Sequence, residues 1–216
     1  MHRMRCVFHP GSIRAWLGTA ILTASCLCLG QNTASANEGS GPAPAMAADV
    51  FAYLDEPDSD RAESILQRLL ANPATTIEEV TRTIQTGRPY GPQPVGTMPE
   101  EELVVRDRPY HYALSVPLAY HPDKGYGLVL CLHGAGFSGD AYLERWQSRL
   151  GDDYILACPT YPAGAWFTRR AEELVLAVLD RIQQRYHVDP DRVFLTGMSN
   201  GGIGTWLIGM HHAQRF

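Results

Sequence analysis

The stretch RVFLTGMSNGG, residues 192–202, predicts a strand, a sharp turn and a helix in immediate succession. Its first five residues are mostly apolar or β-branched, as in a strand that is buried on both faces. Gly197, Ser199 and Gly201 then form a G-x-S-x-G pattern, and the largely apolar segment from Asn200 onward is typical of a helix. The serine is therefore expected at the point where the strand passes into the helix.

This position suits a nucleophile. A serine on such a turn presents its hydroxyl clear of the sheet, and Gly197 and Gly201 remove side chains that would clash where strand and helix nearly touch. Gly202 is a further glycine of the motif, and the helix directs its N-terminal dipole at the site, where it favours a developing oxyanion. A glycine-rich loop can carry the same letters by chance, but the strand, turn and helix together favour Ser199 as the catalytic nucleophile.

A second loop points to the same chemistry. The segment LCLHGAGF, residues 130–137, places an HG sequence at the end of an earlier apolar run. Such a loop supplies one backbone N–H to an oxyanion hole, and the residue after the nucleophile supplies the other, which predicts Ala135 and Asn200 as the donors. The small residues Gly134 and Gly136 let the main chain approach the substrate oxygen.

The order of elements predicts an α/β fold with a mostly parallel sheet, preceded by a small helical segment. The first two strands are expected to pair antiparallel, and the later ones are apolar runs typical of parallel strands covered on both faces. The expected strands are 103–106, 110–116, 127–132, 154–158 and 192–196, with helices at 170–186 and from 200 onward.

The chain divides into five expected segments. A Pro/Gly-rich connector separates a helical pair, with helices at 60–72 and 76–87, from the α/β part. The segments are a signal peptide (1–36), a flexible lead-in (37–48), the helical pair (49–87), the connector (88–100) and a partial α/β domain (101–216).

Residues 1–36 are typical of a secretory signal. The first 14 residues carry three arginines and no acid, and the uncharged stretch 15–30 is about 16 residues long, shorter than the roughly 20 of a spanning helix. Ala34-Ser35-Ala36 fits a signal-peptidase site, which predicts cleavage near Ala36–Asn37 and a secreted or periplasmic protein without a stable membrane anchor. An uncleaved anchor and a lipoprotein signal through Cys26 are weaker alternatives.

Composition excludes several other classes. The chain has 18 Lys+Arg against 23 Asp+Glu, a net charge of −5, so no basic surface for nucleic acid is expected. No CxxC or His-rich spacing indicates a metal site, and no cofactor is predicted. Cys131 and Cys158 stand inside apolar strand-like runs and are interpreted as small core residues, although a disulfide between them stays open.

Trp166 and Phe167 are candidates for a substrate pocket. They follow an expected strand, on the side of a parallel sheet where ligands usually bind. There they could line an acyl or aromatic pocket. Loop aromatics packed as a lid over the core are an equal alternative.

Together, GMSNGG and VLCLHGAG resemble the α/β-hydrolase superfamily, and within it the secreted polyhydroxybutyrate depolymerase and feruloyl-esterase branch. The phrase DPDRVFLTGMSNGGIGTW is also similar to prolyl-oligopeptidase-type and dienelactone-hydrolase-type enzymes. The resemblance covers about residues 103–216. It implies hydrolysis of carboxylic esters, polymeric esters among them, through an acyl-enzyme on Ser199.

The remaining triad members are not evident. In this superfamily the acid and the histidine follow the serine, yet no Asp or Glu follows Ser199. His211 and His212 lie about 18 Å along the helix and are interpreted as polar residues at a helix C-terminus. His133 is interpreted as a brace for the HG loop. The sequence is therefore expected to be truncated after the nucleophile helix, with the acid and base outside it and with little activity of its own.

Two alternatives remain beside an exported ester hydrolase. One is a serine peptidase of prolyl-oligopeptidase type, which the short segment before the first strand disfavours because it cannot form a gating propeller. The other is a non-catalytic remnant that keeps part of the sheet but leaves both glycine loops unexplained.

Overall fold

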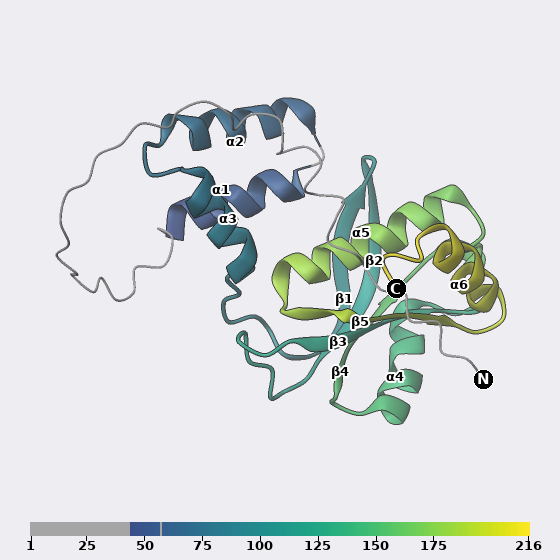
Figure 1. The fold of residues 1–216 in the computed structure, drawn as a ribbon. Helices are drawn as coiled ribbons and strands as arrows, with labels where there is room; N and C mark the ends of the chain where they lie inside the picture. The colour runs from purple at the N-terminus through teal and green to yellow at the C-terminus, as the bar shows by residue number, and fades with distance from the viewer. Residues whose placement is uncertain (1–43, 57) are drawn as a thin grey trace, which may run out of the picture. The chain divides into compact units, whose positions relative to one another are not determined.

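The computed structural model describes residues 44–56 and 58–216 (Figure 1). The sequence predictions for the signal peptide and for residues 37–43 lie outside these residues. Within the described part no helix is both long and apolar enough to cross a membrane. The helices are α1 (Pro44–Asp55), α2 (Ser59–Ala71), α3 (Ile77–Thr86), α4 (Gly139–Leu150), α5 (Arg169–Arg185) and α6 (Asn200–His211). The strands are β1 (Gly96–Val105), β2 (Arg108–Val116), β3 (Tyr126–Leu132), β4 (Tyr154–Pro159) and β5 (Val188–Gly197).

The five strands form one sheet in the order β1-β2-β4-β3-β5. Strand β3 pairs parallel with β4 and with β5, whereas β2 is antiparallel to both β1 and β4. The α/β fold class and the antiparallel pair at the start of the sheet are thus confirmed. Parallel pairing is limited to β4, β3 and β5.

Strands β1 and β5 begin several residues earlier than their sequence patterns indicate, and the expected helical pair is preceded by a third helix, α1. Strand β5 starts at Val188 instead of residue 192. Strand β1 starts at Gly96, inside the expected connector, and has a bulge between Met98 and Glu101. Pro99 fits there because β1 is an edge strand that needs hydrogen bonds on one side only. Helix α1 takes up residues 44–48 of the expected flexible lead-in, and it buries Met46 and Val50 in a small cluster with α2.

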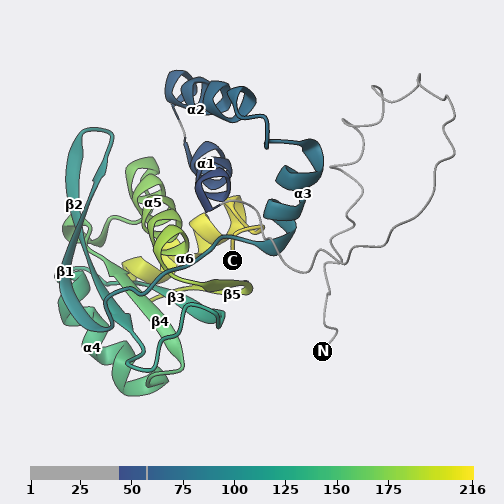
Figure 2. The same ribbon diagram turned by 90° about the vertical axis from the view of Figure 1, so that its left-hand side faces the viewer.

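Helices α4 and α5 cover opposite faces of the sheet (Figure 2). The larger core combines α5 and α6 with inward side chains of β2–β5, and the smaller one lies under α4. Strand β3 is buried along its whole length, as its continuous apolar run predicts. Cys131 and Cys158 are both free and buried in the smaller core, which confirms their interpretation as core residues.

Two of the three N-terminal helices have a side-chain cap at their start. For α2, the Asp58 carboxylate accepts a hydrogen bond from the Arg61 N–H at 3.0 Å. For α3, Thr76 and Glu79 have the spacing of a capping box, in which each side chain bonds the other residue's N–H. Thr76 accepts a hydrogen bond from the Glu79 N–H at 3.2 Å, which is half of the capping box. The Glu79 carboxylate does not return to Thr76 but pairs with Arg82 at 2.6 Å. A single side-chain cap is sufficient to satisfy one of the free N–H groups of this helix start.

Helix α6 carries exposed apolar side chains beside the free edge of the sheet. Trp206 and Met210 are 73% and 68% exposed, and Ile203 is 50% exposed, whereas Ile208 on the same helix is buried. Strand β5 pairs only with β3, so its other edge is open among the described elements. An open strand edge next to an apolar helix face favours association between chains.

We expect Trp206→Gln/Met210→Gln to raise the soluble yield of the chain without lowering its free energy of unfolding. The reason is that both side chains are exposed in the folded chain and contribute little to its core. Ile208→Gln is the matched control on the same helix and should instead destabilise the fold, because it places an amide in the core. Soluble yield and urea unfolding measure both effects. Equal soluble yields and equal free energies of unfolding for the two variants would contradict the placement of Trp206 and Met210 on the exposed face of α6 and of Ile208 on its buried face.

Candidate functional site

Ser199 lies between β5 and α6 in a left-handed backbone conformation, with φ 56° and ψ −122°. Such a φ is uncommon for a residue with a Cβ and costs free energy, so surrounding contacts must hold it. The side chain is exposed, and its hydroxyl donates no hydrogen bond to a described residue. The structure therefore has the strand–turn–helix that the sequence predicts, with the serine at its apex.

The flanking glycines explain how this turn closes. A Cβ at Gly197 would collide with the backbone of Gly201, and a Cβ at Gly201 would collide with the carbonyl of Leu132 on β3. Gly202 differs, because a Cβ there would lie 3.6 Å from Gly197 O, an ordinary contact. Two of the three motif glycines are thus required by the close approach of α6 to both strands.

The HG loop lies directly beside the serine. A Cβ at Gly134 would be 3.5 Å from the Ser199 Cβ and 3.4 Å from Met198 O. The Met198 N–H donates to Leu132 O at 3.3 Å, which joins the two strand ends. Gly136 has a φ of +81°, a conformation that favours glycine. The two loops singled out in the sequence therefore meet at one edge of the sheet.

The two predicted oxyanion donors lie at this meeting point. Ala135 follows Gly134 in the HG loop, and its N–H donates no hydrogen bond to a described residue. Asn200 is the first residue of α6, where an N–H has no partner within the helix. Both N–H groups are thus free of partners among the described residues, as a binding role requires.

His133 is fully buried and holds two loops together. The Tyr161 N–H donates to Nε2 at 3.0 Å, so Nε2 accepts and Nδ1–H donates to Gly134 O at 2.8 Å. Burial lowers the pKa of His133, the hydrogen bond to Gly134 opposing this shift, and the ring is therefore kept neutral. Both ring nitrogens are engaged within the protein, in agreement with a structural brace.

Trp166 does not line an open pocket. Its side chain is fully buried, its indole N–H donates to His133 O at 2.7 Å, and its ring meets the His133 ring edge-on at a centroid distance of 5.0 Å. Gly204 on α6 packs directly against it. The pocket prediction is therefore wrong for Trp166, because the ring fills the space between α6 and the HG loop. The neighbouring Phe167 is exposed, and its role in a pocket stays a prediction.

His211 and His212 both contact one carboxylate at the far end of α6. His212 Nε2 lies 2.6 Å from Glu172 Oε1, and His211 Nδ1 lies 3.3 Å from Glu172 Oε2. The hydrogen bond with His212, followed by that with His211, lowers the pKa of Glu172. These histidines therefore tie α6 to the first turn of α5, and no hydrogen bond joins a described histidine to Ser199.

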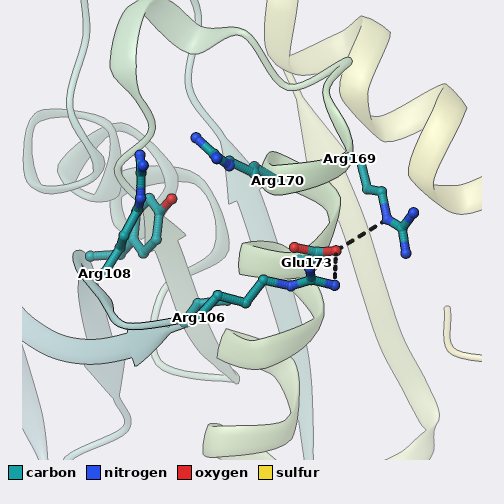
Figure 3. A pocket seen from close by; sticks show the side chains of 7 residues that line it. Arg106, Arg108, Arg169, Arg170 and Glu173 are labelled. Atoms are coloured by element: carbon teal, nitrogen blue, oxygen red, sulfur yellow. Dashed lines mark hydrogen bonds and ion pairs between the residues drawn. The ribbon is translucent and has the colours of Figure 1, made fainter.

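A cluster of arginines near the sheet edge that carries Ser199 is not evident from the sequence. Two pairs of arginines, about 60 residues apart in the chain, line a single cavity between the β1–β2 hairpin and α5 (Figure 3). Only the fold brings them together, and the pattern of either pair alone resembles ordinary surface charge. This arginine cavity has a volume of about 360 Å³ and is lined by Val105, Arg106, Arg108, Tyr110, Arg169, Arg170 and Glu173.

Comparison with known proteins gives matches among solved structures only; no family model and no curated protein sequence matches. A thermostable esterase is 24% identical with a TM-score of 0.47, over 54% of this chain and 38% of that chain. The fluorophosphonate-binding serine hydrolase F of Staphylococcus aureus is 16% identical with a TM-score of 0.50, over 57% and 55%. An S-formylglutathione hydrolase from Agrobacterium tumefaciens is 17% identical with a TM-score of 0.45, over 56% and 54%.

The fold of the described chain is that of the α/β hydrolases. This follows from the likeness to the Staphylococcus aureus serine hydrolase and agrees with the resemblance carried by residues 130–137 and 192–202. The chain spans about half the length of that protein and of the Agrobacterium hydrolase, and less of the thermostable esterase.

We expect Gly201→Ala to lower the free energy of unfolding by about 3 kcal/mol or more, because a Cβ there forces α6 away from β3. Gly202→Ala is the matched control one residue along the same helix, and it should leave the stability unchanged or slightly higher. Urea unfolding of both variants measures the difference. Similar stabilities would show that the crossing at Gly201 is less close than the structure has it.

We expect acid to weaken the attachment of α6 to α5. The lowered pKa of Glu172 means that its contribution to stability is present above its ordinary value of 4.5 and is lost as the pH falls through the lowered value. Glu172→Gln should therefore reduce the loss of stability below pH 4.5, whereas Glu63→Gln, an exposed change on α2, should not. Urea unfolding over a pH series tests this, and identical acid limbs in all three proteins would contradict it.

Proposed function

We propose that this chain carries the nucleophile of an exported serine hydrolase that cleaves carboxylic esters. In the proposed reaction the Ser199 oxygen attacks the ester carbonyl, the serine proton passes to a base and then to the departing alcohol, and water hydrolyses the acyl-enzyme. The negative oxygen of each tetrahedral intermediate would be held by the N–H groups of Ala135 and Asn200.

The observation that carries this proposal is the position of Ser199. A non-glycine residue with φ 56°, exposed and 3.5 Å (Cβ to the Cβ position of Gly134) from an HG loop, is a costly arrangement with no structural benefit of its own. A simple glycine-rich loop explains neither the strained serine nor the two free N–H groups beside it. Export is proposed from the signal-like residues 1–36.

The acid and the base are proposed to lie in polypeptide outside these 216 residues. No Asp or Glu follows Ser199 in the sequence, and His133, the buried histidine of the site, already uses both ring nitrogens. An unassisted serine is a poor nucleophile, because general-base assistance contributes about 10²–10⁴-fold. This proposal therefore includes very low activity of the 216-residue chain by itself.

A peptidase of prolyl-oligopeptidase type is the less favoured alternative. The described residues before β1 form three short helices, α1 to α3, which cannot supply a gating propeller. The substrate branch proposed from the resemblance is that of secreted polyhydroxybutyrate depolymerases and feruloyl esterases. Hydrolysis of a proline amide but not of an ester would favour the peptidase instead.

A fluorophosphonate probe tests the nucleophile in the protein purified from its native source. We expect covalent labelling of the peptide that contains Ser199, because labelling requires an activated serine. Ser199→Ala should abolish it, and Ser148→Ala, on α4, is the control that should not. The intact mass of the same sample establishes how much polypeptide accompanies the 216 residues.

The 216-residue chain produced alone is the second arm. We expect negligible turnover of a nitrophenyl ester, because the base is missing. Rapid turnover abolished by Ser199→Ala would overturn the proposal that acid and base lie outside, and absence of labelling in the native protein would favour a non-catalytic remnant.

A further inference from the structure

The arginine cavity contains one carboxylate that two guanidinium groups already hold. Arg106 Nη2 lies 2.7 Å and Arg169 Nε 3.2 Å from Glu173 Oε1 (Figure 3). The two arginines come from the β1–β2 turn and from the first turn of α5, so elements distant in sequence converge on one oxygen. Guanidinium groups match carboxylates in shape and charge, and this pair shows that the cavity can hold one.

The other two arginines lack such a partner. Arg108 and Arg170 point to the same side of the cavity, away from Glu173, and neither forms an ion pair or hydrogen bond with a described side chain (Figure 3). Both also line an adjoining hollow of about 470 Å³. The remaining walls of this hollow are Pro109, Tyr110, Tyr161 and Pro162. Two free cations thus face a space large enough for a small organic molecule.

The local charge is strongly positive in an acidic chain. Four arginines line the cavity and Glu173 is its one acidic lining residue among the described residues, while the protein as a whole has a net charge of −5. Glu172, next in the helix, is held by the two histidines of α6, and Asp107 of the hairpin turn does not line the cavity. Like charges that are brought together repel each other, so a bound anion would be stabilised here.

The hollow lies one loop away from Ser199. The segment that follows β4 forms its wall with Tyr161 and Pro162, while the backbone of Tyr161 contacts His133. Gly164 of the same segment lies against the HG loop, since a Cβ there would be 3.2 Å from Ala135 N. The arginines and the proposed oxyanion donors therefore lie on two sides of one short segment, at the edge of the sheet where ligands bind in α/β folds.

We propose that Arg108 and Arg170, supported by Arg106 and Arg169, form a binding site for a small organic carboxylate. Anion binding rests on the cavity alone. Its role as the subsite that selects ester substrates with a free carboxylate rests on the proposed function.

Equilibrium dialysis of the full chain against radiolabelled citrate, at low and constant ionic strength, tests the site without requiring activity. We expect saturable binding that Arg108→Gln/Arg170→Gln weakens about tenfold or more, the effect of losing charge-assisted hydrogen bonds. The control, Arg68→Gln/Arg82→Gln, removes two charges from α2 and α3 outside the cavity and should leave binding unchanged. Circular dichroism verifies the fold of both variants.

Glu173→Gln should change the affinity for citrate in the opposite direction. It releases Arg106 and Arg169 from their internal carboxylate, so citrate should bind several-fold more tightly. Glu78→Gln, on α3, makes the same change of net charge away from the cavity and should have no effect.

Three outcomes would overturn the site: no saturable citrate binding, an equal loss in the control double variant, or tighter binding of inorganic phosphate than of citrate. Failure of the proposed hydrolase function is recognised by a different measurement, the fluorophosphonate labelling of Ser199. Citrate binding without fluorophosphonate labelling of Ser199 would retain the carboxylate site and reject its role as a substrate subsite. Labelling without citrate binding would retain the hydrolase and reject the site.

Discussion

The close crossing of α6 over the ends of β3 and β5 is the constraint on which the whole site depends. Gly197 and Gly201 touch through their backbones, and Gly201 lies against the carbonyl of Leu132. Because Leu132 ends β3 and is paired with Gly197 of β5, this single contact fixes where the HG loop starts and where the serine turn lies. The left-handed φ of Ser199 is maintained by that geometry: the helix cannot begin elsewhere without opening the sheet.

The buried rings of His133 and Trp166 hold the segment after β4 against the HG loop and α6. Trp166 fills the space beside Gly204 and donates to His133 O, while His133 accepts from Tyr161. A charged imidazole here would lose that acceptor and would be buried without a counter-charge, so the neutral state indicated by its lowered pKa is the one that the packing permits. The histidine of the HG loop thus acts on the site through position and cannot also serve as its base.

The sequence predicts those parts of the structure whose determinants are local. The motif glycines, the buried strands β3 and β4 and the helix α5 follow from short patterns, and the structure has them where expected. Strand β5 is present, but the expectation that it is buried on both faces is wrong: it lies at the edge of the sheet, and Phe194 is 45% exposed. The sequence predicts too late a start for strand β1, because Pro99 is typical of a connector unless the strand lies at the edge of the sheet. Trp166 and the arginine cavity depend on contacts between segments 30 to 60 residues apart, which periodicity does not encode.

The β1–β2 turn shows how such a non-local feature is maintained. Arg106 and Asp107 both have positive φ, 48° and 61°, in a two-residue hairpin where Asn-Gly is the usual choice. That conformation costs on the order of 1 kcal/mol per residue. Arg106 is 69% exposed in its ion pair with Glu173, and the pair offsets only part of the cost, since ion pairs at the surface contribute about 0–1 kcal/mol. This ion pair alone therefore does not account for the strained turn, and the proposed carboxylate site would give its arginine a further role.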